Sequence, residues 1–363
     1  MKLKDITAVL ESAVPLALQE SYDNAGLIVG DPAREITSAL LTLDVTEEVL
    51  EEAERKNCNL IIAHHPILFS GLKKIIGKSY VERIVIKAIK KDIALYAMHT
   101  NLDSVDFGIS YKLAEKLGLK DISVLKPQGE LKKLVVFVPH NQAENVRNAM
   151  FDAGAGHIGN YDSCSYNLEG KGSFRALENA NPYVGKKGGV HFEGETRIET
   201  VFPEYLTSKI VREMISAHPY EEVAYDIYKL DQVNPKTGMG MIACYEKAMP
   251  VKEFLNKVKK ELNVSVLRHT KIVTDKVQRV AVCGGSGSFL IQDAIRKKAD
   301  VLITGDIKYH QFFDADDKII LVDAGHYETE QFAKEIFYDL LTKKIPKFAL
   351  QFSEVNTNVI NYF

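Results

Sequence analysis

The chain has 363 residues, of which 46% are hydrophobic and 26% charged, and 46 basic residues nearly balance 49 acidic ones to give a formal net charge of −3. The length predicts two or three domains, and the lack of a basic excess disfavours nucleic acid as a partner. No stretch approaches the roughly 18 apolar residues that span a bilayer. Acidic residues interrupt the N-terminal region where a secretory signal would be apolar, so we expect a cytoplasmic protein without a membrane partner.

The first 125 residues alternate helical and short apolar patterns. Helices are predicted over 2–15, 46–57 and 80–92, and strands over 36–45, 59–66 and 93–100. Thr46 is a plausible N-cap for the second helix. The strands are continuous apolar runs rather than alternating ones. This pattern is typical of parallel strands covered by helices on both faces.

Between residues 128 and 233 the pattern changes to that of a small α+β domain. Strand, helix, strand, strand, helix and strand follow in order at 132–139, 142–155, 161–177, 196–203, 205–219 and 224–230. This β-α-β-β-α-β order is the ferredoxin-like motif.

After residue 233 the α/β alternation resumes. Helices are predicted at 251–263, 289–299 and 328–344, and strands at 277–285, 301–306 and 318–325. We therefore predict a discontinuous α/β domain with a mostly parallel sheet, formed by 1–127 and 234–363 and interrupted by an inserted α+β ferredoxin-like domain at 128–233.

Potential metal ligands gather where the predicted α/β strands end. The four cysteines lie far apart without a CxxC pair, which indicates a reducing compartment and leaves imidazole and carboxylate as metal ligands. Because the carboxyl ends of parallel strands meet at one edge of a sheet, these segments should converge on one crevice. The ligands in question are His64, His65, His99, Asp103, Asp306, His310, Asp323, His326, Glu328 and Glu330.

The spacing of these residues favours two ions over one. Neighbouring side chains in extended backbone diverge, so His64 and His65 suit two adjacent ions rather than a single one. His326 and Glu330 are four residues apart where a helix begins, which places them on one helical face. A carboxylate can bridge two metals, so Asp103 and Glu330 are the candidate bridges. Such a ligand set suits zinc, iron(II), manganese or cobalt.

Two weaker signals lie near this cluster. The sequence CGGSGSF (283–289) falls between a strand and a helix, where backbone N–H groups could hold an anion, although it is neither a Walker loop nor a dinucleotide fingerprint. A plain tight turn is the alternative. Asp44 ends a strand at the same crevice, where it could orient a metal ligand or cap the helix that follows.

Five stretches of the chain together resemble the Nif-three-like family, also known as GTP cyclohydrolase I type 2 homologues. They are SYDNAGLIVGD (21–31), LIIAHHPILF (60–69), MHTNLD (98–103), VLITGDIKYH (301–310) and GHYETE (325–330). The resemblance implies that His64, His65, Asp103, His326 and Glu330 bind two divalent metal ions, with zinc as the first expectation and iron or manganese as alternatives. It also places His99 and His310 near the metal centre.

The middle segment resembles the PII/CutA-like insert of longer bacterial members of that family. The stretches that carry this resemblance are IGNYDSCSY, GKGSFRAL, NPYVGKKG, ETRIETVFP and AHPYEEVAYDIY. The resemblance implies a toroidal homohexamer whose metal sites face an inner cavity.

The implied function is metal-dependent hydrolysis of a nucleotide or another phosphate-containing substrate, with metal-activated water as the nucleophile. His99, Asp306 or His310 would then shuttle protons. The alternative is a non-catalytic protein that stores or delivers metal, or that senses a ligand through its insert.

Overall fold

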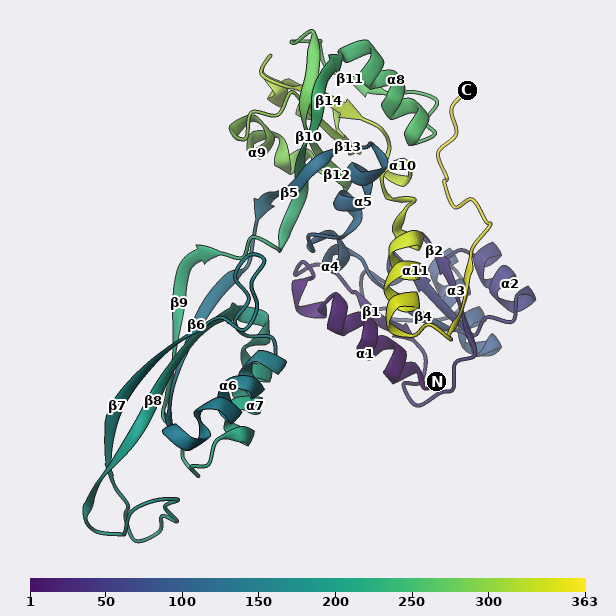
Figure 1. Ribbon diagram of the computed structural model, residues 1–363. Helices are drawn as coiled ribbons and strands as arrows, with labels where there is room; N and C mark the ends of the chain where they lie inside the picture. The colour runs from purple at the N-terminus through teal and green to yellow at the C-terminus, as the bar shows by residue number, and fades with distance from the viewer. The chain divides into compact units, whose positions relative to one another are not determined.

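A computed structural model describes residues 1–363, and Figure 1 shows its helices and strands. The chain divides into two compact units. The discontinuous unit comprises Met1–Pro127 together with Lys236–Phe363, and the inserted unit comprises Gln128–Pro235. No helix is both long enough and apolar enough to cross a bilayer.

The discontinuous unit contains a five-stranded sheet with the strand order β1-β4-β3-β2-β15. Strands β4, β3, β2 and β15 run parallel, and β1 pairs with β4 antiparallel at the edge. The strands are β1 (Gly26–Val29), β2 (Ser38–Thr42), β3 (Leu60–Ala63), β4 (Ala94–Ala97) and β15 (Ala349–Phe352). The helices around it are α1 (Leu3–Ala13), α2 (Glu47–Arg55), α3 (Tyr80–Lys91) and α11 (Ala333–Lys344), with the 3-10 turn η1 (Leu16–Leu18).

Both faces of this sheet are buried. Ala39 and Leu41 of β2 belong to the core formed with α1 and α11, whereas Leu40 belongs to the core formed with α2 and α3. The continuous apolar runs therefore indicated doubly covered strands correctly. The predicted N-cap of α2 is confirmed, since the Thr46 hydroxyl accepts a hydrogen bond of 3.2 Å from the Val49 N–H.

A second, six-stranded sheet in the same unit has the order β11-β14-β13-β12-β10-β5. Strands β12, β13 and β14 run parallel, and the other pairs are antiparallel. The strands are β5 (Lys120–Pro127), β10 (Gly238–Pro250), β11 (Arg268–His269), β12 (Lys276–Ser286), β13 (Val301–Gly305) and β14 (Ile320–Asp323). Helical segments are α4 (Thr100–Asp103), α5 (Ile109–Lys116), α8 (Val251–Glu261), η4 (Ser288–Leu290), α9 (Ile291–Arg296), η5 (Tyr309–Ala315) and α10 (His326–Glu330).

The predicted α/β class is confirmed, but the expectation of one sheet for all ligand segments is wrong. The chain pairs its last strand, β15, with the early strand β2, and it pairs β5 with β10 across the insertion. These long-range pairings create two sheets. Apolar periodicity reports only that a strand is buried and does not identify its neighbours.

The inserted unit contains one antiparallel sheet with two helices packed on one of its faces. The sheet order is β7-β8-β6-β9, and the helices contribute Val146, Met150, Ile210 and Met214 to its core. The elements are β6 (Glu130–Pro139), η2 (His140–Gln142), α6 (Ala143–Asp152), β7 (Ser165–Arg175), β8 (Val190–Pro203), η3 (Glu204–Leu206), α7 (Thr207–Ala217) and β9 (Tyr225–Val233). Their order is the β-α-β-β-α-β order of the ferredoxin-like motif.

Candidate metal centre

The first sheet carries the first half of the predicted ligand set. His64 and His65 directly follow β3, and His99 follows the neighbouring strand β4. Asp103 ends the single helical turn α4 that continues from His99. Because β3 and β4 are parallel, these side chains leave the sheet at the same edge.

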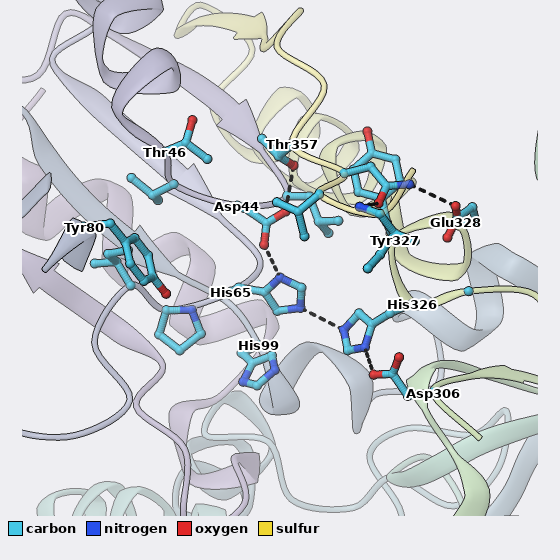
Figure 2. Close-up of a pocket in the computed structure, with 18 of the residues that line it drawn as sticks. Asp44, Thr46, His65, Tyr80, His99, Asp306, His326, Tyr327, Glu328 and Thr357 are labelled. Atoms are coloured by element: carbon cyan, nitrogen blue, oxygen red, sulfur yellow. Dashed lines mark hydrogen bonds and ion pairs between the residues drawn. The ribbon is translucent and has the colours of Figure 1, made fainter. Parts of the chain in front are cut away.

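The second sheet supplies the other half. Asp306 follows β13, and α10 begins at His326 and ends at Glu330 just after β14. His326 and Glu330 lie one helical turn apart, so both face the same side of α10. Figure 2 shows His65, His99 and His326 converging from the two halves of this unit.

The Glu330 carboxylate lies at the centre of the cluster. Its Oε2 is 3.0 Å from Nε2 of both His65 and His326, and its Oε1 is 3.7 Å from Nε2 of His64. His64 Nε2 is in turn 3.7 Å from Oδ1 of Asp103. Glu330 therefore contacts every imidazole that was predicted to bind metal.

The potential ligand atoms form two sets that share Glu330. One set is His65, His326 and Glu330, the other is His64, Asp103 and Glu330, and in each the atoms lie within 4.8 Å of one another. A third set joins the neighbouring imidazoles of His64, His65 and His99. A tetrahedral ion with ligand bonds of about 2.0–2.2 Å holds neighbouring ligand atoms roughly 3.3–3.6 Å apart. The observed separations are close to that spacing.

Unsatisfied polar atoms support the same conclusion. Nε2 of His64, Oδ1 of Asp103 and Oε2 of Glu330 are buried without a hydrogen-bond partner. Leaving three such atoms unpaired at one place would be costly for a folded protein. A cation between them would satisfy all three, so the residues fit a metal ion.

Each of the imidazoles of His64, His65 and His326 is fixed from its far side. Nδ1 of His64 donates to the Met98 carbonyl, Nδ1 of His65 to Asp44 and Nδ1 of His326 to Asp306, each at 2.7 Å. With Nδ1 engaged in this way, Nε2 is the nitrogen of each ring that faces the cluster, and the Nε2 atoms of His65 and His326 lie 3.3 Å apart. Asp44 therefore orients the His65 ring, and Thr46 rather than Asp44 caps α2.

The electrostatics of the cluster also favour bound cations. Burial and the neighbouring Glu330 carboxylate raise the pKa of Asp103 to about 8. Burial opposes the charged form of His65, but the nearby carboxylates of Asp44 and Glu330 outweigh it and raise the pKa to about 10. Similar contacts with Glu330 and Asp306 raise the pKa of His326 to about 9 despite burial. The buried Glu330 carboxylate thus stabilises positive charge at this place, and a bound cation would favour the ionised form of Asp103.

Two glycines at the end of β12, Gly284 and Gly285, lie against the cluster. Gly285 has φ +59°, and a Cβ atom added there would lie 2.1 Å from Oε1 of Glu330. The Gly285 N–H donates to the Thr329 hydroxyl at 3.0 Å. The lack of a side chain at Gly285 therefore leaves space for the Glu330 carboxylate.

The three predicted proton-transfer residues occupy different environments. Nδ1 of His99 contacts Asp23 at 2.8 Å, and the ring centre lies 5.3 Å from that of His64. Asp306, which has φ +56°, faces His326. His310 is exposed on η5, where its ring contacts Tyr309 and Phe313.

A cavity of about 1150 Å³ opens beside the cluster. His65, His99, Asp306 and His326 reach it from the metal side (Figure 2), while His310 is not among its lining residues. Residues that the sequence analysis did not single out complete the lining; they include Phe69, Tyr80, Arg268, Tyr327, Thr357, Asn358 and Tyr362.

Some site residues escaped prediction because only the fold brings them close. Thr357 donates to Asp44 at 2.7 Å across 313 positions of the chain. Asp23 accepts hydrogen bonds from the backbone and hydroxyl of Thr100, next to His99. Asp23 lies in the stretch 21–31 that resembles the family, and this resemblance could have indicated its place in the site. No sequence pattern marked Thr357.

These features define an α/β protein with a buried histidine–carboxylate cluster that could hold metal ions. Residues 1–359 match the family described as Duf34/NIF3 (NGG1p interacting factor 3), and the chain belongs to that family. The resemblance noted from its motifs is thereby confirmed.

Relatives of similar length bear one common name. A Halalkalibacterium halodurans protein named GTP cyclohydrolase 1 type 2 homolog is 43% identical over 88% of this chain and 87% of its own length. A Bacillus subtilis protein of the same name is 40% identical over 99% of this chain and 98% of its own. The crystal structure of a Bacillus cereus protein related to NIF3 matches with a TM-score of 0.88 and 39% identity, over 100% of this chain and 99% of that one.

Proposed function

We propose that this protein binds two divalent metal ions that share the Glu330 carboxylate. His64 and Asp103 would complete one site, and His65 and His326 the other. The observation that carries this proposal is the pair of three-ligand sets with Glu330 in common. Imidazole and carboxylate ligands suit zinc, which we propose as the native metal, with iron or manganese as alternatives.

We further propose that the centre catalyses hydrolysis of a nucleotide or another phosphate-containing compound. Two bound ions would lower the pKa of a water molecule and neutralise charge on a substrate oxygen. The adjoining cavity of about 1150 Å³ has room for a nucleotide, and it offers the aromatic rings of Tyr80 and Phe69 and the guanidinium of Arg268. The name shared by the relatives favours a guanine nucleotide among the candidates.

Within this scheme His99 is the best-placed proton carrier. It lines the cavity beside His65, and the buried Asp23 carboxylate holds its Nδ1. Nε2 is therefore the nitrogen left to exchange protons with a substrate. Asp306 is better placed to orient His326, to which it is hydrogen-bonded.

The test measures turnover and bound metal in the same preparations. Metal-stripped protein, and protein reloaded with zinc, manganese or iron(II), would be assayed on GTP, other nucleotides and simple phosphate esters. We expect reloading to restore turnover, and Glu330→Gln to lose both metal and activity. Glu51→Gln, a surface change on α2 with the same loss of charge, should keep both.

The outcomes separate the competing accounts. Turnover that is indifferent to metal removal would contradict the mechanism. Two firmly bound ions without turnover on any substrate would favour the alternative of a non-catalytic metal-binding or ligand-sensing protein. Full metal occupancy in Glu330→Gln would contradict the site itself.

We also propose a toroidal homohexamer, which rests on the resemblance to longer bacterial family members. Light scattering on protein eluted from a size-exclusion column should then give a molar mass of about six times the 40.6 kDa mass of one chain. A monomer or dimer at micromolar concentration would contradict this assembly.

A further inference from the structure

The inserted unit contains a cavity of about 480 Å³ that has no part in the metal centre. Residues of β6, β7 and β8, the loop after β7 and the segment before β9 form it. Its lining includes Phe137, Phe174, Arg175, Tyr183, Glu195, Tyr220, Glu221 and Glu222. This volume is in the range of small-molecule sites.

A buried carboxylate forms one wall of this cavity. Glu195 is only 9% exposed. Its Oε1 accepts a 3.0 Å hydrogen bond from the Tyr220 hydroxyl, and no protein group donates to its Oε2. A Cβ atom added at Gly172 would lie 2.1 Å from that Oε2, so the glycine leaves room for the carboxylate in this position.

The charge of Glu195 is not balanced by a neighbouring base. No Lys, Arg or His nitrogen lies within 4 Å of it, unlike the neighbouring Glu193 and Glu199. His218 is close, but its Nε2 faces the Phe137 carbonyl at 3.0 Å and its Nδ1 accepts the Tyr220 N–H at 3.1 Å. Those two bonds define a neutral imidazole. A buried carboxylate without a counter-charge favours a cationic ligand.

Aromatic rings surround the same space. The Tyr220 ring lies between Phe174 and Tyr183, with ring centres 6.3 Å and 6.1 Å away and interplanar angles of 57° and 52°. All three residues line the cavity, and the faces of aromatic rings attract organic cations. At the rim, Glu221 and Glu222 outnumber the single cation, Arg175.

We propose that this cavity binds a small organic ammonium compound. The ammonium group would lie against Glu195, with the rings of Phe174, Tyr183 and Tyr220 around its carbon atoms. This proposal does not depend on the metal centre or on its chemistry. It gives the inserted unit a ligand site of its own.

Calorimetric titration of the full-length, metal-loaded protein tests the proposal. The probes are choline and n-butylammonium, and the control ligand is the neutral carbon isostere of choline. We expect saturable binding of at least one ammonium probe at one site per chain, and no binding of the isostere. Glu195→Gln, whose amide oxygen can still accept from Tyr220, should weaken binding about tenfold or more.

Two further variants guard against a folding artefact. Tyr183 is 50% exposed, so Tyr183→Ala should fold normally and still weaken binding several-fold. Glu213→Gln, on the surface of α7, should bind as the wild type does. The proposal is overturned if no ammonium probe binds saturably, if the isostere binds equally well, or if Glu195→Gln and Tyr183→Ala both keep wild-type affinity.

Discussion

Each imidazole of the candidate metal centre is held by an oxygen at its far side, and for His65 that oxygen belongs to Asp44. Asp44 in turn accepts from Thr357, so a row of hydrogen bonds runs from Thr357 through Asp44 to His65 (Figure 2). The negative charge of Asp44 makes the imidazole a stronger base and holds its ring in place.

Changing Asp44→Asn keeps the size of this side chain and removes its charge. Outer partners of metal ligands typically contribute a factor of about 10–100 to affinity, so zinc binding should weaken by that much. Competition with a chromophoric chelator would measure the change. The surface variant Glu51→Gln is the matched control, and an Asp44→Asn protein with wild-type affinity would show that the Asp44 charge does not act on the metal.

Gly285 provides a second test at the level of single residues. In Gly285→Ala the new methyl group would meet Oε1 of Glu330, and the positive φ alone costs about 1–2 kcal/mol for an L-residue. We expect lower thermal stability and substantially reduced metal content, measured by calorimetry and elemental analysis. Gly71→Ala is the control, because nothing lies within 4 Å of its Cβ position. Normal metal content in Gly285→Ala would argue against the packing described here.

Among the secondary-structure elements, α2 anchors the C-terminal segment that continues to the cavity. The Glu52 carboxylate of α2 is buried and accepts from the Ser353 hydroxyl and the Glu354 N–H. Lys56, one turn later, forms an ion pair with it at 2.9 Å. This anchor lies only a few residues before Thr357, which contacts Asp44.

The Glu52 anchor should make stability depend on pH in a defined direction. Burial opposes ionisation, but the bonds from Ser353, Glu354 and Lys56 prevail and lower the pKa of Glu52. Because the folded pKa lies below the unfolded value of about 4.3, the carboxylate stabilises the fold above that pH. The contribution is lost as pH falls through the folded pKa.

Glu52→Gln should therefore destabilise the protein by about 1–3 kcal/mol at pH 7. The difference from wild type should shrink as the pH is lowered below about 4. Denaturant unfolding of both proteins across this range measures it. A difference that grows toward acid, or that is absent at pH 7, would contradict the role assigned to Glu52.

The sequence predicted elements better than their pairing. Thr46 as an N-cap, the doubly covered strand around Leu40 and the fold class all follow from local patterns, which the structure bears out. Motifs also placed His64 and Glu330 in one candidate site. The two sheets, the space left by Gly285 and the bond from Thr357 to Asp44 depend on contacts far apart in the chain, which periodicity does not encode.

For the whole molecule, the main feature is that the inserted unit enters at one point of the second sheet. Gly238 pairs with Pro127 and Met239 with Lys126, so the chain leaves and returns through adjacent strands. The hydrophobic cores of the discontinuous unit consist only of residues of that unit. The core of the inserted unit consists only of residues of the inserted unit. Such an arrangement is typical of separately folding parts.

Replacing Gln128–Pro235 with a short glycine-containing turn should therefore leave a soluble protein with the same metal content per chain. Circular dichroism and elemental analysis would measure folding and metal. A truncated chain that aggregates, or that folds without metal, would show that the discontinuous unit needs its insert.

The claim that most needs direct testing is the pair of metal sites joined by Glu330. Crystals of the full-length, metal-loaded protein should show two anomalous peaks per chain at the absorption edge of the bound metal. One peak should lie about 2.0–2.2 Å from ligand atoms of His64, Asp103 and Glu330, and the other at the same distances from His65, His326 and Glu330. A single peak, or two peaks that do not both contact Glu330, would contradict this account.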